Sequence, residues 1–203
     1  MSARPLLLAT ANPGKLRELR AMLGDMAVIG LADVGIDDLP ETADTFLGNA
    51  TQKAVEAARL TGLVCLADDS GLCVDALDGA PGVFSARFAG RHGDDAANRA
   101  LLLERLRDVA DDLRTARFRC VLALADAAGA LESRVLHAEG ECHGSITRAP
   151  RGDGGFGYDA LFVPIGETRT MAELPSSWKH QLSHRGAALR AMLPILLTYI
   201  GSH

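Results

Sequence analysis

Three lysines are candidates for contact with phosphate. The chain carries 21 lysine and arginine residues, and only Lys15, Lys53 and Lys179 are lysine. Where arginine supplies most of the positive charge, the remaining lysines suit tasks that need a compact ammonium group, such as contact with phosphate oxygens. Chance explains the count of three equally well, so the segments around the lysines must decide between the two interpretations.

Lys15 closes the first of these segments, which is Thr10-Ala11-Asn12-Pro13-Gly14-Lys15. Asn12 followed by Pro13 is typical of a helix N-cap and its first helical position. The segment therefore predicts a loop between a short strand and a helix, a place where backbone N–H groups attract anions. It is no Walker A loop, because Leu16 stands in place of Ser or Thr and the glycine spacing is absent. Two interpretations remain: a phosphate-binding loop, or a simple helix cap beside a solvated lysine.

Paired carboxylates form the second candidate. Asp68 and Asp69, with Ser70 after them, directly follow the apolar run 63–67, which predicts that they lie at the end of a buried strand. Carboxylates in such a position commonly hold Mg²⁺, which takes one or two of them together with substrate phosphates and water. Glu41 is a further candidate ligand from a distant segment. The alternative is a polar turn.

The third candidate is a glycine-rich loop near the C-terminal end. Residues 152–157 match G-x-G-x-x-G formally, but they precede an expected strand rather than a helix, which excludes a dinucleotide fingerprint. The loop ends in Phe156 and Asp159, an aromatic face and a carboxylate that together are able to recognise a purine. The alternative is a phenylalanine in the core. His180 and His184 have zincin spacing but lack the glutamate, so we do not expect zinc.

Composition excludes several classes of protein. The chain has 203 residues, 48% hydrophobic residues and a net charge of −5, with an isoelectric point near 5.7. It therefore has enough length for a sizeable core and no basic footprint for nucleic acid. The four cysteines lie far apart without a C-x-x-C pair, which favours reduced thiols. No apolar run approaches the roughly 18 residues of a membrane span. We expect a cytoplasmic protein without nucleic-acid or membrane partners.

Elements of both kinds are needed to position these candidates. Periodicity and capping residues predict helices and strands that alternate at first and then include a hairpin, which favours an α/β fold with a mixed sheet. The expected helices cover residues 13–23, 45–61, 95–106 and a final helix capped by Ser183. The expected strands cover residues 6–9, 63–67, 72–76, 118–126, 131–137 and 158–163. The two middle strands, 118–126 and 131–137, are expected to form the hairpin through residues 127–130.

Taken together, the segments resemble the inosine triphosphate pyrophosphatase family, which removes non-standard purine nucleotides from the nucleotide pool. Six motifs in family order, spanning nearly the whole chain, carry the resemblance. They are Thr10-x-Asn12-x-x-Lys15, Glu41-Thr42-x-x-Thr45-Phe46-x-x-Asn49-Ala50, Ala67-Asp68-Asp69-Ser70-Gly71-Leu72, Gly79-Ala80-Pro81-Gly82-Val83-x-Ser85-Ala86-Arg87, Gly154-Gly155-Phe156-Gly157-Tyr158-Asp159 and Lys179-x-x-x-Ser183-His184-Arg185-Gly186.

The resemblance implies a fold and a reaction. The fold would be an elongated mixed β-sheet flanked by helices, with residues 1–203 forming a single domain of two lobes and a nucleotide cleft between them. The reaction would be Mg²⁺-dependent hydrolysis of ITP, dITP and XTP to the nucleoside monophosphate and pyrophosphate. The family is usually homodimeric, so a homodimer is expected here.

The resemblance also implies roles for individual residues. Asp69 would act as general base and metal ligand, with Glu41 and Asp68 assisting at the metal. The triphosphate would be bound by Thr10, Ala11, Asn12, Pro13, Gly14, Lys15 and Lys53. The rest of the nucleotide would be held by Ser70, Phe156, Gly157, Tyr158, Asp159, Lys179, His184 and Arg185.

Three departures from the family pattern and two alternative functions accompany this interpretation. Gly48 stands where the family often has glutamate, Ser177 and Trp178 stand where acidic residues often precede Lys179, and Ala11 stands where glycine is common. One alternative is a related pyrophosphatase that acts on pyrimidine or modified nucleoside triphosphates. The other is a nucleotide sensor without catalytic activity, which would not need Asp69 as a base.

Overall fold

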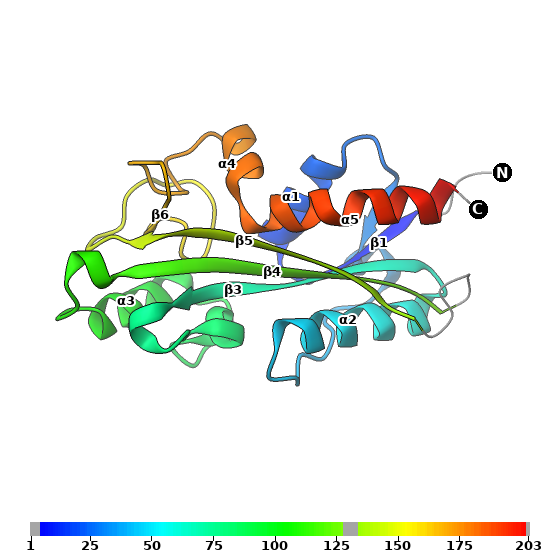
Figure 1. The fold of residues 1–203 in the computed structure, drawn as a ribbon. Coiled ribbons are helices and arrows are strands. Elements are labelled where there is room, and N and C mark those ends of the chain that lie inside the picture. Colours follow the sequence, from blue (N-terminus) through cyan, green and yellow to red (C-terminus); the bar gives the residue numbers. More distant parts are fainter. Residues whose placement is uncertain (1–4, 128–133, 202–203) are drawn as a thin grey trace. The chain divides into compact units, whose positions relative to one another are not determined.

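The computed structural model describes residues 5–127 and 134–201 (Figure 1). The strands are β1 (Leu6–Ala9), β2 (Val28–Gly30), β3 (Val64–Val74), β4 (Thr115–Asp126), β5 (Leu136–Ile146) and β6 (Phe162–Pro164). The α-helices are α1 (Pro13–Leu23), α2 (Phe46–Thr61), α3 (Asp95–Arg105), α4 (Ser176–Leu182) and α5 (His184–Gly201). Short 3₁₀ helices, turns and loops connect these elements.

The six strands form one mixed sheet in the order β2-β1-β3-β4-β5-β6. β1 is parallel to both of its neighbours, with Leu7 opposite Ile29 of β2 and Cys65 of β3. β5 and β6 are antiparallel, with Ser145 opposite Val163. The parallel strands are joined through helices, as parallel pairs require. These findings confirm the predicted α/β class with a mixed sheet flanked by helices.

The chain divides into two compact units. The first comprises Met1–Asp69, Cys120–Gly140 and Ala188–His203, and the second comprises Ser70–Arg119 and Glu141–Ala187. The boundaries fall inside β3, β4, β5 and α5, so each of these elements contributes residues to both units. Asp69 and Ser70, two neighbouring residues of β3, therefore belong to different units.

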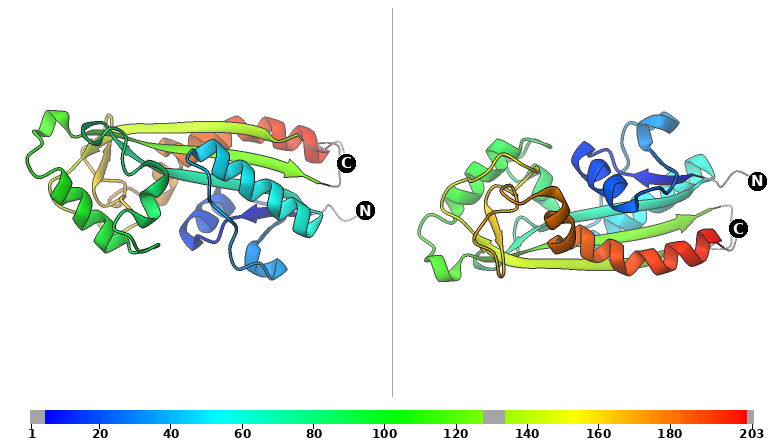
Figure 2. Two further views of the ribbon diagram at one scale, coloured as in Figure 1. Left: turned by 90° about the horizontal axis from the view of Figure 1, so that it is seen from below. Right: turned by 90° about the horizontal axis from the view of Figure 1, so that it is seen from above.

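In the first unit, helices cover both faces of the strands. The views in Figures 1 and 2 place α1 and the first-unit part of α5 on one face and α2 on the other. The core on the α1 face contains leucines of β1, α1 and α5. On the other face, α2 contributes four buried alanines, which are Ala50, Ala54, Ala57 and Ala58. Small side chains allow this helix to approach the strands closely.

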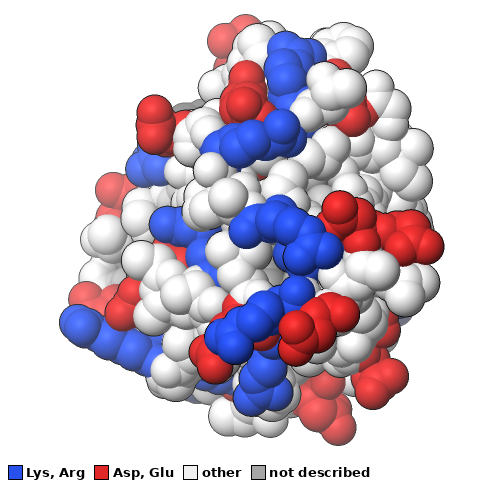
Figure 3. All heavy atoms as spheres, turned by 90° about the vertical axis from the view of Figure 1, so that its left-hand side faces the viewer, with Lys and Arg blue, Asp and Glu red and all other residues white. Residues whose placement is uncertain are grey.

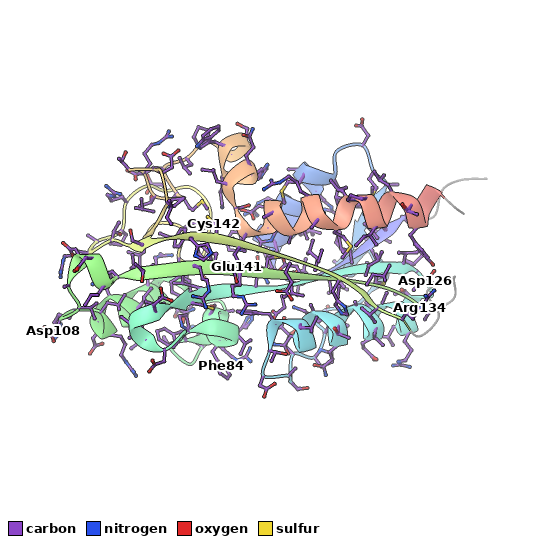
Figure 4. The ribbon with its side chains drawn as sticks, viewed as in Figure 1. Phe84, Asp108, Asp126, Arg134, Glu141 and Cys142 are labelled. Carbon is purple, nitrogen blue, oxygen red and sulfur yellow. The ribbon has the colours of Figure 1, made fainter. Side chains whose placement is uncertain are left out.

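The second unit has its own core, built from β3, β4, β5, α3 and the segment around Tyr158. Its section of β5 alternates strictly, so that Glu141 is exposed and the neighbouring Cys142 is buried (Figure 4). Such alternation is typical of a strand with one solvated face. On the face drawn in Figure 3, lysine and arginine side chains lie interspersed with aspartate and glutamate side chains. Among the described residues, no helix is long and apolar enough to span a membrane.

Several predicted boundaries are wrong. Residues 64–74 form one continuous strand, whereas the sequence predicted a break at Asp68. β5 begins at Leu136 and continues to Ile146, so the predicted strand 131–137 covers only its start, and the expected turn at 127–130 lies mostly outside the described residues. Residues 158–161 are turns, and β6 begins only at Phe162. The strand prediction for residues 158–161 relied on their apolar side chains. It failed because Tyr158 and Leu161 enter the core from a turn.

Candidate active site

The start of α1 is organised by Asn12, as predicted. Its Oδ1 accepts hydrogen bonds from the backbone N–H groups of Gly14, at 2.8 Å, and Lys15, at 3.1 Å. The Asn12 N–H in turn donates to Thr10 Oγ1 at 3.2 Å. The cap thus satisfies two of the N–H groups that would otherwise be free at this helix end, where Pro13 itself has none. The Lys15 side chain is consequently the main group that this segment offers to an anion.

Asp68 and Asp69 lie in the middle of β3, on opposite faces of the sheet. Successive side chains of a strand point to opposite sides, and the contacts of these two aspartates agree with that rule. Asp68 contacts residues of α1 and β4, whereas Asp69 contacts residues of α2. Both carboxylates are buried. The strand continues through them because each carboxylate has a lysine as its partner.

On the α1 face, Asp68 holds Lys15. The distance from Lys15 Nζ to Asp68 Oδ1 is 2.6 Å, and the Asp68 side chain is fully buried. The Cys120 thiol donates to the other oxygen, Asp68 Oδ2, at 3.2 Å. Both oxygens of Asp68 therefore have a partner, and this carboxylate fixes the position of the Lys15 ammonium.

On the α2 face, Lys53 lies between two carboxylates. Its Nζ contacts Glu41 Oε1, lies 3.4 Å from Asp69 Oδ1, and donates to the Asp68 carbonyl at 2.8 Å. Burial lowers the pKa of Lys53, but the charges of Asp69 and Glu41 outweigh it, and the net shift is upward. Burial raises the pKa of Asp69 above its usual value, although Lys53 and Lys15 oppose the rise. Asp69 is thus a stronger base than an exposed aspartate.

Asn49 connects Asp69 to the segment that carries Glu41. Its Nδ2 donates to Asp69 Oδ2 at 3.2 Å, and its Oδ1 accepts from the Ala43 N–H at 2.9 Å. Gln52, one turn later on α2, accepts from the Thr42 N–H at 3.1 Å. The sequence analysis assigned no role to the Asn49 or Gln52 amide. Asn49 does belong to the motif that begins at Glu41, and its spacing of four from Lys53 places both residues on the same face of α2.

Gly48 allows the Glu41 segment to approach α2. A Cβ atom at this position would lie 2.6 Å from the Ala43 Cβ and 3.0 Å from Thr45 Oγ1, the oxygen that caps the helix. A side chain at position 48 would therefore require residues 43–45 to shift. This close approach is a physical reason for glycine where the resembling family often has glutamate.

The oxygen ligands on the α2 face suit a hard divalent cation. Glu41 and Asp69 each place one carboxylate oxygen against a single cationic group, the Lys53 ammonium. Mg²⁺ prefers hard oxygen ligands such as these two carboxylates. Among the described residues, no group of three or more His, Cys, Asp and Glu side chains is arranged to hold a metal ion. The opposite orientation of Asp68 explains why its carboxylate does not join the other two.

In the second unit, the glycine-rich loop brings Phe156, Asp159 and Lys179 together. Asp159 Oδ2 accepts from Lys179 Nζ at 2.6 Å and from the Phe156 N–H at 3.0 Å. Lys179 Nζ lies 5.4 Å from the centre of the Phe156 ring, within the range of a cation–π contact. Gly155 has φ +75°, and a Cβ there would lie 2.9 Å from both the Asp159 Cγ and the Lys179 Nζ. Only glycine fits this position without displacing the pair.

Trp178 points away from this cluster. Its indole N–H donates to Glu167 Oε1 at 2.6 Å, and its side chain is 42% exposed, whereas the neighbouring Lys179 is buried. The departure from the family pattern at position 178 therefore leaves the contacts of Lys179 intact.

The start of α5 brings Arg185 to the same ring. Ser183 Oγ accepts from the Gly186 N–H at 3.0 Å, which confirms the predicted cap. Arg185 Cζ lies 5.8 Å from the centre of the Phe156 ring, and Arg185 Nη2 donates to Ser70 Oγ at 2.9 Å. The guanidinium is therefore fixed between an aromatic face and the strand residue that follows Asp69.

His184 and Tyr158 face the core of the second unit. The His184 imidazole stacks on Phe118 at 4.8 Å between ring centroids. Tyr158 is buried, and its hydroxyl donates to the Ser85 carbonyl at 3.0 Å. Burial raises the pKa of this phenol far above its usual value. The side chain of Tyr158 thus anchors the loop rather than presenting its hydroxyl at the surface.

The predicted site residues fall into two groups. The first unit brings together Lys15, Lys53, Glu41, Asp68 and Asp69. The second unit brings together Ser70, Phe156, Asp159, Lys179 and Arg185. Two residues of α3 that contact Gly157 had no role in the sequence analysis, because nothing in their spacing points to a glycine some sixty positions later.

Comparisons with known proteins agree on one family. Residues 6–195 match the model of the Ham1 family. The chain is 51% identical over 201 residues to the dITP/XTP pyrophosphatase of Streptomyces coelicolor, covering 97% of this chain and 98% of that protein. It is 52% identical over 202 residues to the protein of the same name from Nocardia farcinica, covering 97% and 96%. Among solved structures, a HAM1 protein from Coxiella burnetii superimposes with a TM-score of 0.85 at 41% identity, covering 96% of this chain and 99% of that one.

Proposed function

Because this chain belongs to the Ham1 family, we propose that it hydrolyses non-standard purine nucleoside triphosphates. Its substrates would be dITP, ITP and XTP, and its products the nucleoside monophosphate and pyrophosphate. The dITP/XTP pyrophosphatases that it resembles support this choice. We further propose that both units act on the same substrate molecule and so form a single catalytic domain, with the triphosphate at the first unit and the base at the second.

The cluster around Asp69 is the observation that carries the proposal. A buried carboxylate with a raised pKa lies next to the Lys53 ammonium and receives a hydrogen bond from Asn49. A carboxylate in this state is suited to take a proton from water at neutral pH. Lys53 next to it, and Lys15 held by the adjacent Asp68, supply positive charge where a triphosphate would carry negative charge. A sensor that only binds nucleotides has no need for such a base.

The charged residues of the first unit would share the tasks of the proposed reaction. Asp69 accepts the proton of the attacking water, whose oxygen forms the new bond to phosphorus while pyrophosphate leaves. Lys15 and Lys53 bind phosphate oxygens and neutralise the charge that shifts onto them, since phosphoryl-transfer catalysis consists largely of positioning and charge stabilisation. Asp68 keeps Lys15 in place, and Asn49 keeps Asp69 in place.

Mg²⁺ would be held by Glu41 and Asp69, whose oxygens already converge on one cation. Asp68 would join them only by giving up its contact with Lys15 or Cys120. When bound, the metal would supply charge neutralisation for the triphosphate.

The second unit would recognise the base. Phe156 offers a ring for stacking, and Arg185 and Lys179 offer donors for the 6-oxo group of hypoxanthine or xanthine. Adenine has an amino group at that position, so a donor of the protein would face a donor of the base. Mismatches of this kind discriminate by up to about 10⁴-fold.

Product analysis tests the proposal. The protein would be incubated with Mg²⁺ and dITP, XTP, ITP, GTP, ATP or dTTP in turn, and pyrophosphate and orthophosphate would be measured separately. We expect pyrophosphate from the first three substrates at much higher rates than from ATP or dTTP. Release of orthophosphate, or a preference for dTTP, would overturn the proposed reaction or its specificity, and intact nucleotide throughout would support the sensor.

A substitution tests the assignment of the base. Asp69→Asn keeps the size of the side chain but removes its charge, so we expect loss of turnover with a folded protein. Asp25→Asn, an equivalent change at an exposed aspartate of the same unit, is the control and is expected to be active. Activity of Asp69→Asn within about tenfold of the wild type would contradict a base whose contribution is typically 10²–10⁴-fold.

The proposal includes a homodimer in the cytoplasm, as the resemblance implies. Sedimentation analysis of the purified protein at several concentrations measures the oligomeric state directly, and a monomer throughout the range would contradict the dimer.

A further inference from the structure

Two side chains of α3 hold both backbone polar groups of Gly157. Asp95 Oδ2 accepts from the Gly157 N–H at 2.6 Å, and Arg99 Nη1 donates to the Gly157 carbonyl at 2.7 Å. Asp95 and Arg99 are four residues apart and therefore lie on the same face of the helix. Because α3 binds both the N–H and the carbonyl of this loop residue, it limits the rotation of the two peptide units on either side of Gly157.

Gly157 directly follows Phe156 in the chain. The other side of Phe156 is also held, because its own N–H donates to Asp159 Oδ2 at 3.0 Å. Gly157 has φ +59°, in the left-handed region, so the chain turns sharply just after the aromatic residue. Hydrogen bonds on both sides of Phe156 thus hold the backbone from which its ring projects.

α3 is a firm support for this contact. Asp94 caps the helix by accepting from the Ala97 N–H at 3.0 Å, and Leu102 is fully buried in the core of the second unit. The buried Asn98 accepts from the Ala89 N–H at 2.8 Å and donates to the Ala86 carbonyl at 3.2 Å. The helix is therefore attached at its start, its middle and its apolar face.

We propose that Asp95 and Arg99 are positioning residues for base recognition, holding Phe156 in the orientation in which it stacks on the purine. The inference rests on the proposed function, in which Phe156 contacts the base. Neither side chain has to touch the substrate. Their loss would leave the Lys15, Lys53 and Asp69 cluster unchanged, so binding of the base and binding of phosphate would respond differently.

Ligand binding separates this role from a merely structural one. Inosine monophosphate, which has a base, and pyrophosphate, which has none, would be titrated into wild type, Asp95→Ala and Arg99→Met, with isothermal titration calorimetry as the measurement. Arg105→Met, an exposed arginine of the same helix, is the matched control.

We expect the dissociation constant for inosine monophosphate to rise about tenfold in either variant, the effect of losing one charge-assisted hydrogen bond that fixes the loop. The constant for pyrophosphate should stay within about twofold of wild type, and Arg105→Met should change neither. In turnover of dITP, KM should rise more than kcat falls. Arg99→Lys, which keeps a charge and one donor, should recover part of the affinity, and it replaces Arg99→Met if that variant does not fold.

Equal weakening of both ligands would overturn the proposal, because a general loss of structure would then explain the effect. Unchanged affinity for inosine monophosphate would overturn it as well. Failure of the proposed function has a different signature: wild-type protein would not release pyrophosphate from dITP, whatever the behaviour of the α3 variants in the binding experiment.

Discussion

Replacement of Lys53 by methionine tests the charge balance of the site most directly. Methionine has a similar length and no charge, so the change removes the ammonium that contacts Glu41 and Asp69 without opening a large cavity. Removing one partner of a buried ion pair typically costs about 3–5 kcal/mol. The Glu41 side chain is 28% exposed and can be solvated by water. We therefore expect a loss at the lower end of this range, about 3 kcal/mol of unfolding free energy at about pH 8.

The loss of stability in Lys53→Met should be larger at high pH than at low pH. In the wild type, the raised pKa of Lys53 provides stability that is present below its unfolded value of 10.5, so this contribution is constant near neutrality. In Lys53→Met, Asp69 loses its main counter-charge, and its already raised pKa should rise further. The folded variant then binds more protons than the unfolded chain, so its stability falls as pH increases. We therefore expect a smaller difference from wild type at about pH 5 than at about pH 8.

Urea unfolding at the two pH values, with and without Mg²⁺, measures these quantities. A divalent cation between Glu41 and Asp69 should restore part of the lost stability, whereas an equal ionic strength of potassium chloride should not. Arg59→Met removes a cation from the exposed face of the same helix and should cost less than about 0.5 kcal/mol. A cost for Lys53→Met below about 1 kcal/mol at both pH values would refute the assignment of Lys53 as the counter-charge.

Three further predictions concern the second lysine, the base and a buried thiol. Lys15→Arg should raise KM or lower kcat for dITP several-fold, because the larger planar guanidinium would place its charge differently beside Asp68 and toward the phosphates. Kinetics equal to those of wild type would favour the interpretation that lysine stands at position 15 by chance. Arg185→Ala should lower kcat/KM for ITP by about 10–150-fold and for ATP much less, and equal losses would assign the guanidinium to the phosphates instead. Burial raises the pKa of Cys142 from 9.0 to about 11, so the folded thiol keeps its proton while the unfolded chain loses it. Above pH 9.0 its contribution to stability should fall by up to about 1.4 kcal/mol per pH unit. Urea midpoints of Cys142→Ala should accordingly depend less on alkaline pH than those of wild type, and identical slopes would contradict the shift.

Local signals in the sequence predicted the helices that carry the site. Asn12, Thr45 and Asp94 cap α1, α2 and α3 through their own side chains, an interaction that involves only residues within three positions. Because capping and helical periodicity are local, both could be read without knowledge of the fold. The strands were harder. β3 was divided at Asp68 because two adjacent carboxylates are unfavourable in a strand unless counter-charges meet them, and those charges come from other elements.

Motif order pointed to the candidate residues, but their roles depended on the fold. Asp68 and Asp69 look equivalent in sequence, and the structure assigns one to Lys15 and the other to Lys53. Tyr158 lies in a motif with Phe156, yet its side chain enters the core. The amide of Asn49 contacts a carboxylate twenty residues later. No spacing rule predicts such a contact.

By itself, then, the sequence determined the α/β class, the capped helices, the family and the residues from which a site would be made, because these follow from local patterns and from motif order. The tertiary structure alone decided which lysine meets which aspartate, that glycine at position 48 allows the Glu41 segment to approach α2, and that α3 holds Gly157. The physical reason is the same in each case. Contacts between residues distant in the chain depend on which face of a strand or helix each side chain occupies after packing, and that arrangement is a property of the whole fold.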